Sequence, residues 1–262
     1  SITVIKNDDD ILPIKNLDTL NIAILSIGKK DTSIFQKTCS LYTNVNFYSL
    51  NSNDSDSLFN NTFNNLKKYN LIIAAITNTD MNFSKKFGVT DKTISFLQKV
   101  SDSLNTVIVI FGSPYIIDRF NKIDKFKSIV ISYEDKKAVQ SITAQLIFGA
   151  IPSKGKLTVT SFNREIKNNF GIKTNNIVRT KYTIPEEIGI KSVQLYAIDS
   201  IINNALAEKA FPGCVVYIAK DNKVFFHKAY GNITYEDSTK LMTNNIFDLA
   251  SITKIAATTP MI

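Results

Sequence analysis

The sequence predicts an α/β fold, a largely parallel sheet flanked by helices, followed by a truncated α+β segment. Between Leu20 and Ser161, apolar β-rich runs alternate with amphipathic helical periods joined by short connections. Several runs are continuously apolar, as in Val107-Ile108-Val109-Ile110-Phe111, which is the pattern of a strand buried on both faces. This alternation favours a sheet of about five or six parallel strands with helices on both sides.

The predicted strands share a high content of β-branched residues: Leu20–Ile27, Val45–Leu50, Leu71–Ile76, Thr106–Phe111, Ser128–Ser132 and Lys156–Thr160. The predicted helices each place apolar residues on one face: Ser55–Tyr69, Thr90–Leu104 and Lys136–Gly149.

After residue 161 the alternation stops. Residues 163–183 are polar, and Pro185 to Gly189 reads as a linker entering a new unit. We therefore predict two domains, 1–183 and 184–262. The second begins with an amphipathic helix over Ser192–Ala210 and a hairpin of Cys214–Ala219 and Val224–Tyr230 around Asp221-Asn222. A small-residue helix is expected from Phe247 to Ile262. One helix and two strands cannot bury their own apolar faces, so we expect this segment to be the start of a larger domain.

Composition excludes several classes of function. The net charge is +8, but Arg119, Arg164 and Arg179 are the only arginines among 31 basic residues. Bidentate recognition of phosphates and bases favours arginine, and no basic stripe is interleaved with aromatic residues, so no nucleic-acid partner is expected. No apolar run is long enough for a transmembrane helix. The two cysteines, Cys39 and Cys214, are expected to be buried free thiols.

Ser251-Ile252-Thr253-Lys254 is the sharpest chemical motif. A catalytic serine needs a nearby proton acceptor and fixed donors for the developing oxyanion. In a helix beginning at Ser251, Lys254 lies one turn on, beside the hydroxyl, and the Ser251 amide is free to be an oxyanion donor. The same spacing occurs at Ser26–Lys29 and Ser153–Lys156, which we interpret as ordinary loop or strand-end residues. Ser251 and Lys254 are the predicted catalytic residues.

The residues around this motif resemble the opening of the serine β-lactamase and penicillin-binding-protein-like family. The similarity covers about 186–262 and is carried by Phe211 to Val224, Ala229-Tyr230-Gly231 and Phe247 to Lys254. It implies that Ser251 is acylated and that Lys254 assists. The family's Tyr-x-Asn element and Lys-Thr-Gly-type strand are expected beyond Ile262, so the fragment alone is expected to be inactive.

A second resemblance covers about 1–183. The segments Ile2 to Asn7, Ile11 to Ile14, Phe111 to Tyr115, Tyr133 to Asp135 and Ala144 to Leu157 are similar to the C-terminal α/β domain of family-3 glycoside hydrolases. Members carrying both modules resemble β-N-acetylhexosaminidase and β-lactamase-like fusions of Bacteroidetes type. The resemblance implies a saccharide or cell-wall-derived substrate bound by a barrel expected before Ser1. Both glycosidase carboxyl residues belong to that barrel, so none is assigned here.

Other polar residues are expected to be structural. Asp8-Asp9-Asp10 is interpreted as a surface turn, Glu134-Asp135 as charge at a helix start, and His227 as a structural residue within the hairpin. No glycine-rich phosphate loop or metal-ligand pattern occurs, so no cofactor and no metal are expected.

Three functions remain open. The first is an accessory domain of a β-N-acetylhexosaminidase-like enzyme fused to a serine hydrolase. The second is a parent that acts chiefly through Ser251, as a penicillin-binding, esterase or peptidase enzyme. The third is a non-catalytic, flavodoxin-like binding module. Both resemblances imply a periplasmic or cell-envelope location in a bacterium.

Overall fold

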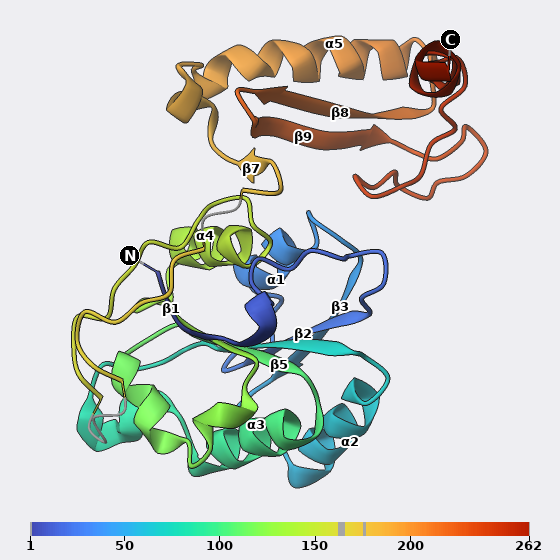
Figure 1. Ribbon diagram of the computed structural model, residues 1–262. Coiled ribbons are helices and arrows are strands. Elements are labelled where there is room, and N and C mark those ends of the chain that lie inside the picture. Colours follow the sequence, from blue (N-terminus) through green and yellow to red (C-terminus); the bar gives the residue numbers. More distant parts are fainter. Residues whose placement is uncertain (1, 162–165, 175–176, 262) are drawn as a thin grey trace. The chain divides into compact units, whose positions relative to one another are not determined.

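The computed structural model describes residues 2–161, 166–174 and 177–261. The chain divides into two compact units, Ser1–Lys181 and Tyr182–Ile262 (Figure 1). The first unit holds the sheet that the apolar runs predict, and the second holds a helix and a hairpin.

The first unit is built on a six-stranded sheet of order β1-β6-β5-β4-β2-β3. All neighbours are parallel except β1, which runs antiparallel to β6. The α/β prediction is therefore confirmed. The strands are β1 (Thr3–Asn7), β2 (Ile22–Ile27), β3 (Val45–Leu50), β4 (Leu71–Ile76), β5 (Thr106–Ile110) and β6 (Ser128–Ile131). Every residue of β2, β4, β5 and β6 is buried, as expected for strands covered on both faces.

Helices cover both faces of this sheet (Figure 1). On one face, α1 (Ile34–Cys39) and α4 (Lys137–Ile147) pack over the core that includes Phe35 and Ile147. On the other, α2 (Asp56–Leu66) and α3 (Asp91–Ser103) pack over the larger core that includes Phe63 and Leu97. Alternate residues of each strand supply the two cores.

Three of these helices begin at a hydroxyl side chain that satisfies a free backbone N–H. Ser33 Oγ accepts from Gln36 N at 3.1 Å, Ser55 Oγ from Leu58 N at 3.3 Å, and Thr90 Oγ1 from Thr93 N at 3.2 Å. The caps therefore fix where α1, α2 and α3 leave the loops that follow β2, β3 and β4.

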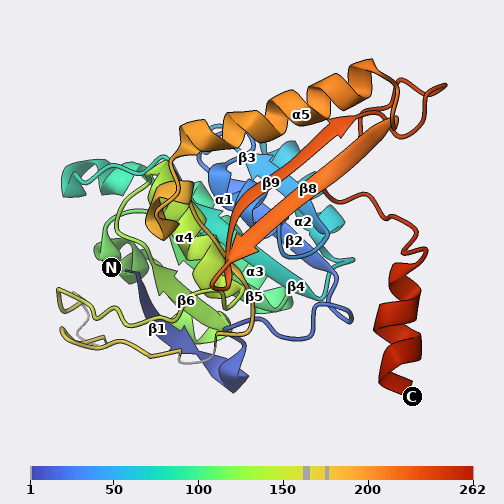
Figure 2. The same cartoon turned by 90° about the horizontal axis from the view of Figure 1, so that it is seen from above.

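The second unit contains a three-stranded sheet of order β7-β9-β8. Its elements are β7 (Lys181–Tyr182), α5 (Tyr196–Ala207), β8 (Gly213–Lys220) and β9 (Lys223–Gly231). The predicted turn residues Asp221 and Asn222 both have positive φ, 52° and 58°, which matches the twist of a tight hairpin. Figure 2 shows α5 lying along β8 and β9. No residue of α5 is fully buried.

Three details differ from the expectation. The segment Lys156–Thr160 is not a strand, because β1 occupies the sheet edge beside β6. Leu157 instead exchanges backbone hydrogen bonds with Asn169 and Phe170, at 2.8 Å each. Strand β1 and the six-residue helix α1 were not predicted. The helix expected from Phe247 begins only at Ile252. Of the polar stretch and the last helix, residues 162–165, 175–176 and 262 lie outside the described residues.

Candidate functional site

The Ser251–Lys254 motif sits at the start of the last helical segment. Hydrogen bonds from Thr253 N to Ala250 O and from Lys254 N to Ser251 O, both 3.1 Å, form its first turns. This winding brings Lys254 Nζ to 3.2 Å from Ser251 Oγ. Ala250, directly before the serine, has φ +43°, a conformation that is costly for a residue with a Cβ.

The backbone N–H of Ser251 has no acceptor within the part of the chain that the structure describes. It lies before the first complete helical turn, where such groups are normally unpaired. An N–H in this position can donate a hydrogen bond to an oxygen beside Ser251 Oγ on which negative charge develops.

The other two Ser-x-x-Lys matches have a different environment. Ser26 is buried in β2, where its Oγ lies 3.4 Å from Thr77 Oγ1. Ser153 is fully buried. Across the described ranges, no hydrogen bond joins Ser26 to Lys29 or Ser153 to Lys156, so Ser251–Lys254 is the motif in which serine and lysine meet.

Both members of this pair are exposed. In this pair Lys254 Nζ donates a hydrogen bond to the serine hydroxyl. A general base must instead be the neutral amine, which burial favours because it disfavours the charged form. The two side chains lie within hydrogen-bond distance, and a role for the lysine as general base would require that the pair be buried.

His227 lies in β9, between two tyrosine rings. Its ring makes an edge contact with Tyr217, with centroids 5.0 Å apart, and its Nδ1 is 3.5 Å from Tyr182 Oη. Burial lowers the pKa of His227, and a backbone hydrogen bond with Thr243 opposes that shift. These contacts fit the structural interpretation.

The acidic residues that the sequence analysis interpreted as structural form ion pairs and hydrogen bonds within the fold. Asp8 and Asp9 form ion pairs with Lys6 and Lys127. Asp135 Oδ2 accepts from Asn78 N at 2.6 Å, which ties the loop after β6 to the loop after β4. In the described ranges, no group of three or more His, Cys, Asp or Glu side chains is arranged to hold a metal ion.

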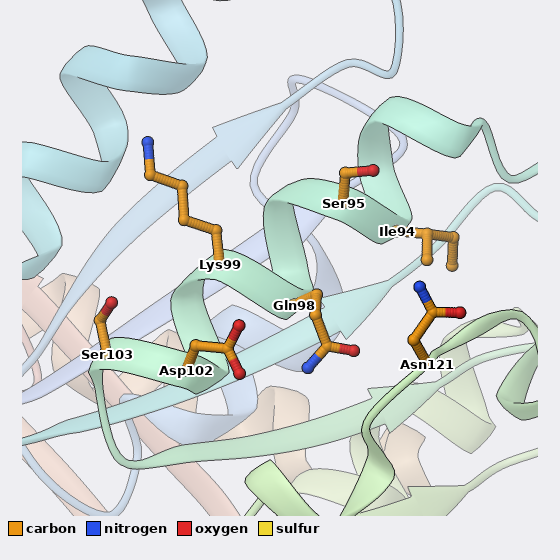
Figure 3. Close-up of a pocket in the computed structure, with 7 residues that line it drawn as sticks. All are labelled: Ile94, Ser95, Gln98, Lys99, Asp102, Ser103 and Asn121. Atoms are coloured by element: carbon orange, nitrogen blue, oxygen red, sulfur yellow. The ribbon is translucent and has the colours of Figure 1, made fainter.

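A shallow hollow along α3 also lacks reactive chemistry. Figure 3 shows its lining, in which Lys99 extends away from Gln98 and Asn121. Gln98 exchanges hydrogen bonds with the backbone of Lys122, at 3.1 Å in each direction, and the Lys99 ammonium lies 4.4 Å from the centroid of the Phe63 ring. The polar groups of this hollow brace α3 and its neighbours.

Known proteins resemble the chain in two ways, and no protein-family model matches it. Proteins of Salmonella newport and Salmonella paratyphi B, each named "Putative D-alanyl-D-alanine carboxypeptidase", are 32% identical to it over 81 residues. The match covers 28% of this chain and 18% of those proteins, so the chain spans less than a fifth of their length.

The similar solved structures include several glycosidases, some of which are family-3 glycoside hydrolases. A β-N-acetylglucosaminidase from Paenibacillus sp. aligns with a TM-score of 0.47 at 10% identity, over 58% of this chain and 28% of that one. A β-glucosidase from Listeria innocua gives 0.48 at 14%, over 61% and 25%. A fungal multi-domain β-N-acetylglucosaminidase gives 0.48 at 14%, over 85% and 27%.

No helix within the described residues has both the length and the apolar character needed to cross a membrane.

Proposed function

We propose that residues 184–262 open a serine hydrolase domain in which Ser251 is the nucleophile and Lys254 the proton acceptor. The 3.2 Å separation of Lys254 Nζ and Ser251 Oγ carries the proposal, because a serine hydroxyl is a weak nucleophile until a base within hydrogen-bond reach takes its proton. The 81-residue match to proteins named as D-alanyl-D-alanine carboxypeptidases supports the same reading.

In the proposed reaction, neutral Lys254 accepts the proton of Ser251 Oγ as that oxygen bonds to the acyl carbon of the substrate. The carbonyl oxygen becomes an oxyanion beside the Ser251 N–H. Collapse expels the leaving group, which takes the proton from Lys254, and leaves an acyl ester on Ser251. Water then cleaves the ester. The proposed role requires the neutral amine, which burial favours because it disfavours the charged form.

The proposed substrate is an acyl compound of the peptidyl-D-alanine or ester kind, and the proposed location is the periplasm or cell envelope. The substrate class is supported by the sequence resemblance and by the names of the Salmonella proteins, and the location is proposed from the resemblance.

We further propose that residues 1–183 are an accessory domain of a family-3 glycoside hydrolase of the β-N-acetylhexosaminidase type, in a Bacteroidetes-type fusion. The sequence motifs at Ala144 to Leu157 and Phe111 to Tyr115 support this assignment. In that arrangement the glycosidase carboxylates come from a barrel outside these residues, and this chain supplies none of them.

Covalent labelling tests the first proposal. The natural protein that contains this segment is incubated with a fluorescent penicillin and, separately, with a fluorophosphonate probe. We expect Ser251→Ala to abolish labelling and Lys254→Ala to slow it by about a hundredfold or more. The matched control is Ser153→Ala, at a buried Ser-x-x-Lys serine. Labelling that persists unchanged in Ser251→Ala refutes the proposal.

Aryl glycosides test the second. We expect the natural protein to hydrolyse an aryl N-acetyl-β-glucosaminide, and the double variant Ser251→Ala/Lys254→Ala to retain that activity, because the two chemistries use separate residues. Cleavage of other aryl glycosides without cleavage of the N-acetylglucosaminide contradicts the assignment to hexosamine glycosides.

A further inference from the structure

In the sheet of the first unit, the strands that follow β2 in the sequence lie on both sides of β2. From β2 the chain passes to β3 on one side, and all later parallel strands lie on the other side, beginning with β4. The helix after β2 covers one face, and the helix after β4 covers the opposite face. The loops therefore diverge at the carboxyl ends of β2 and β4. Open α/β sheets bind ligands in the crevice formed at such a point.

A cavity of about 400 Å³ occupies this position. Its floor is made by Ser26 at the end of β2, Thr77 just after β4, and Gln140 in α4, which are 1%, 6% and 9% exposed. Its rim carries three exposed lysines, Lys29, Lys37 and Lys137. The volume lies within the range of small-molecule sites.

The floor is polar where the neighbouring positions are apolar. Ser26 lies on the same face of the sheet as Ile22 and Ile24. Thr77 lies on the same face as the alternate core residues of β4. This is the face that α1 and α4 cover. Thr77 Oγ1 donates to Ile27 O at 3.2 Å, so its proton is already used. Ser26 Oγ lies at the long distance of 3.4 Å from Thr77 Oγ1, which leaves its hydroxyl available to a closer acceptor in the cavity.

The wall is held by a chain of hydrogen bonds. Gln140 Nε2 donates to Asp135 Oδ1, while Gln140 Oε1 accepts from Phe35 N at 3.1 Å. Asp135 Oδ2 accepts from Asn78 N at 2.6 Å. The starts of α1 and α4 and the loop after β4 are thereby fixed around the cavity, so a ligand meets a preformed site.

The charge around the cavity is positive. Lys29, Lys37 and Lys137 outnumber the lining carboxylates Asp31 and Asp135. In the described part of the chain, none of the three lysines forms an ion pair, and both oxygens of Asp135 already accept hydrogen bonds. None of the described residues that line the cavity is aromatic, so the lining offers no stacking platform for a base or a sugar ring.

We propose that this cavity binds a phosphate group, as inorganic phosphate or as the phosphate of a small monoester. Lys29, Lys37 and Lys137 supply charge, and the Ser26 hydroxyl supplies a buried donor. The sequence does not reveal the site, because its members come from separate loops and helices that only the folded sheet brings together.

Calorimetric titration of the 262-residue chain with inorganic phosphate at low ionic strength tests the proposal. We expect saturable binding and a dissociation constant that rises at least about tenfold in Lys29→Gln/Lys137→Gln. The control is Lys99→Gln/Lys125→Gln, which removes the same charge from exposed lysines of the first unit that do not line the cavity. Raising the salt concentration should weaken binding in the native chain more than in the cavity variant.

Two results overturn the proposal: no saturation by about 20 mM phosphate, or equal weakening in the cavity and control variants, which indicates a general charge effect. Titration with a sugar phosphate and with the parent sugar identifies the source of the group. Tighter binding of the ester identifies a monoester, and equal binding identifies inorganic phosphate. Binding of the uncharged sugar as tight as that of phosphate also overturns the proposal.

Discussion

The phenol of Tyr230 donates a hydrogen bond to Asp199 Oδ1 at 2.6 Å, which joins β9 to α5. The same carboxylate oxygen accepts from Lys228 at 2.5 Å. Tyr230 is almost fully buried, and burial followed by the bond to Asp199 raises its pKa. Because α5 has no fully buried residue, this polar contact is a main specific attachment of the helix to the hairpin.

Tyr230→Phe is expected to lower the stability of the second unit in a pH-dependent way. The hydrogen bonds from Lys228 and then Tyr230 lower the pKa of Asp199. A carboxyl with a depressed folded-state pKa stabilises the fold above its unfolded pKa, and that contribution is lost as the pH falls through the folded-state value. The difference between Tyr230→Phe and the native chain should therefore be largest near neutrality and shrink below about pH 4.

Urea unfolding followed by circular dichroism at several pH values measures this difference. The control is Tyr196→Phe, which removes a phenol oxygen from an exposed position on α5, the helix that carries Asp199. A deficit in Tyr230→Phe that stays constant through the acid range would show that the carboxylate is not involved.

Arg179→Lys should destabilise the first unit. The Arg179 guanidinium donates to the carbonyl oxygens of Ile14, Lys15 and Phe148, the last two at 2.7 Å. It therefore ties the loop after β1 to the end of α4. A lysine keeps the charge but cannot reproduce the planar fork, so we expect a loss of about 1–3 kcal/mol in the free energy of unfolding. Lys173→Gln, an exposed change nearby, is the control in the same urea titration; equal losses would refute the role of the fork.

Gly28→Ala should be far more costly than Gly189→Ala, although both glycines have positive φ, +144° and +79°. A Cβ at Gly28 would lie 2.2 Å from the carbonyl oxygen of Thr77, whereas a Cβ at Gly189 meets nothing within 4 Å. We expect a loss of about 3 kcal/mol or more at Gly28 and about 1 kcal/mol at Gly189. Thermal unfolding of both variants compares them, and similar losses would mean that the Gly28 loop relaxes freely.

The two free cysteines should differ in reactivity. Cys39 is fully buried and Cys214 is half-buried, and burial raises the pKa of both thiols. Since the thiolate is the nucleophile, alkylation at about pH 8 should modify Cys214 slowly and Cys39 only after urea is added. Cys214→Ser should then show no modification in its native state. Rapid labelling of Cys39 in the folded chain would contradict this packing.

Long apolar runs were sufficient to locate the central strands: β4, which is buried on both faces, has the predicted bounds. The edge strand β3 also has the predicted bounds, although most of its residues are not buried. The short elements β1 and α1 were not predicted. Helix α1 has six residues, too few for a periodic pattern, although the Ser33 and Gln36 capping box was a usable signal. The spacing in Ser251–Lys254 predicts a local contact within one helical turn. The lysine-rimmed cavity depends on strand order, which local patterns do not contain.

Strand β1 has a consequence for how the chain avoids association. It covers the outer edge of β6, pairing Thr3 with Ile131 across more than a hundred residues of intervening sequence. Until both ends of this stretch are synthesised and docked, the apolar edge of β6 offers unpaired N–H and C=O groups to any other strand. Strand β1 thus protects the edge of β6 from pairing with a strand of another molecule.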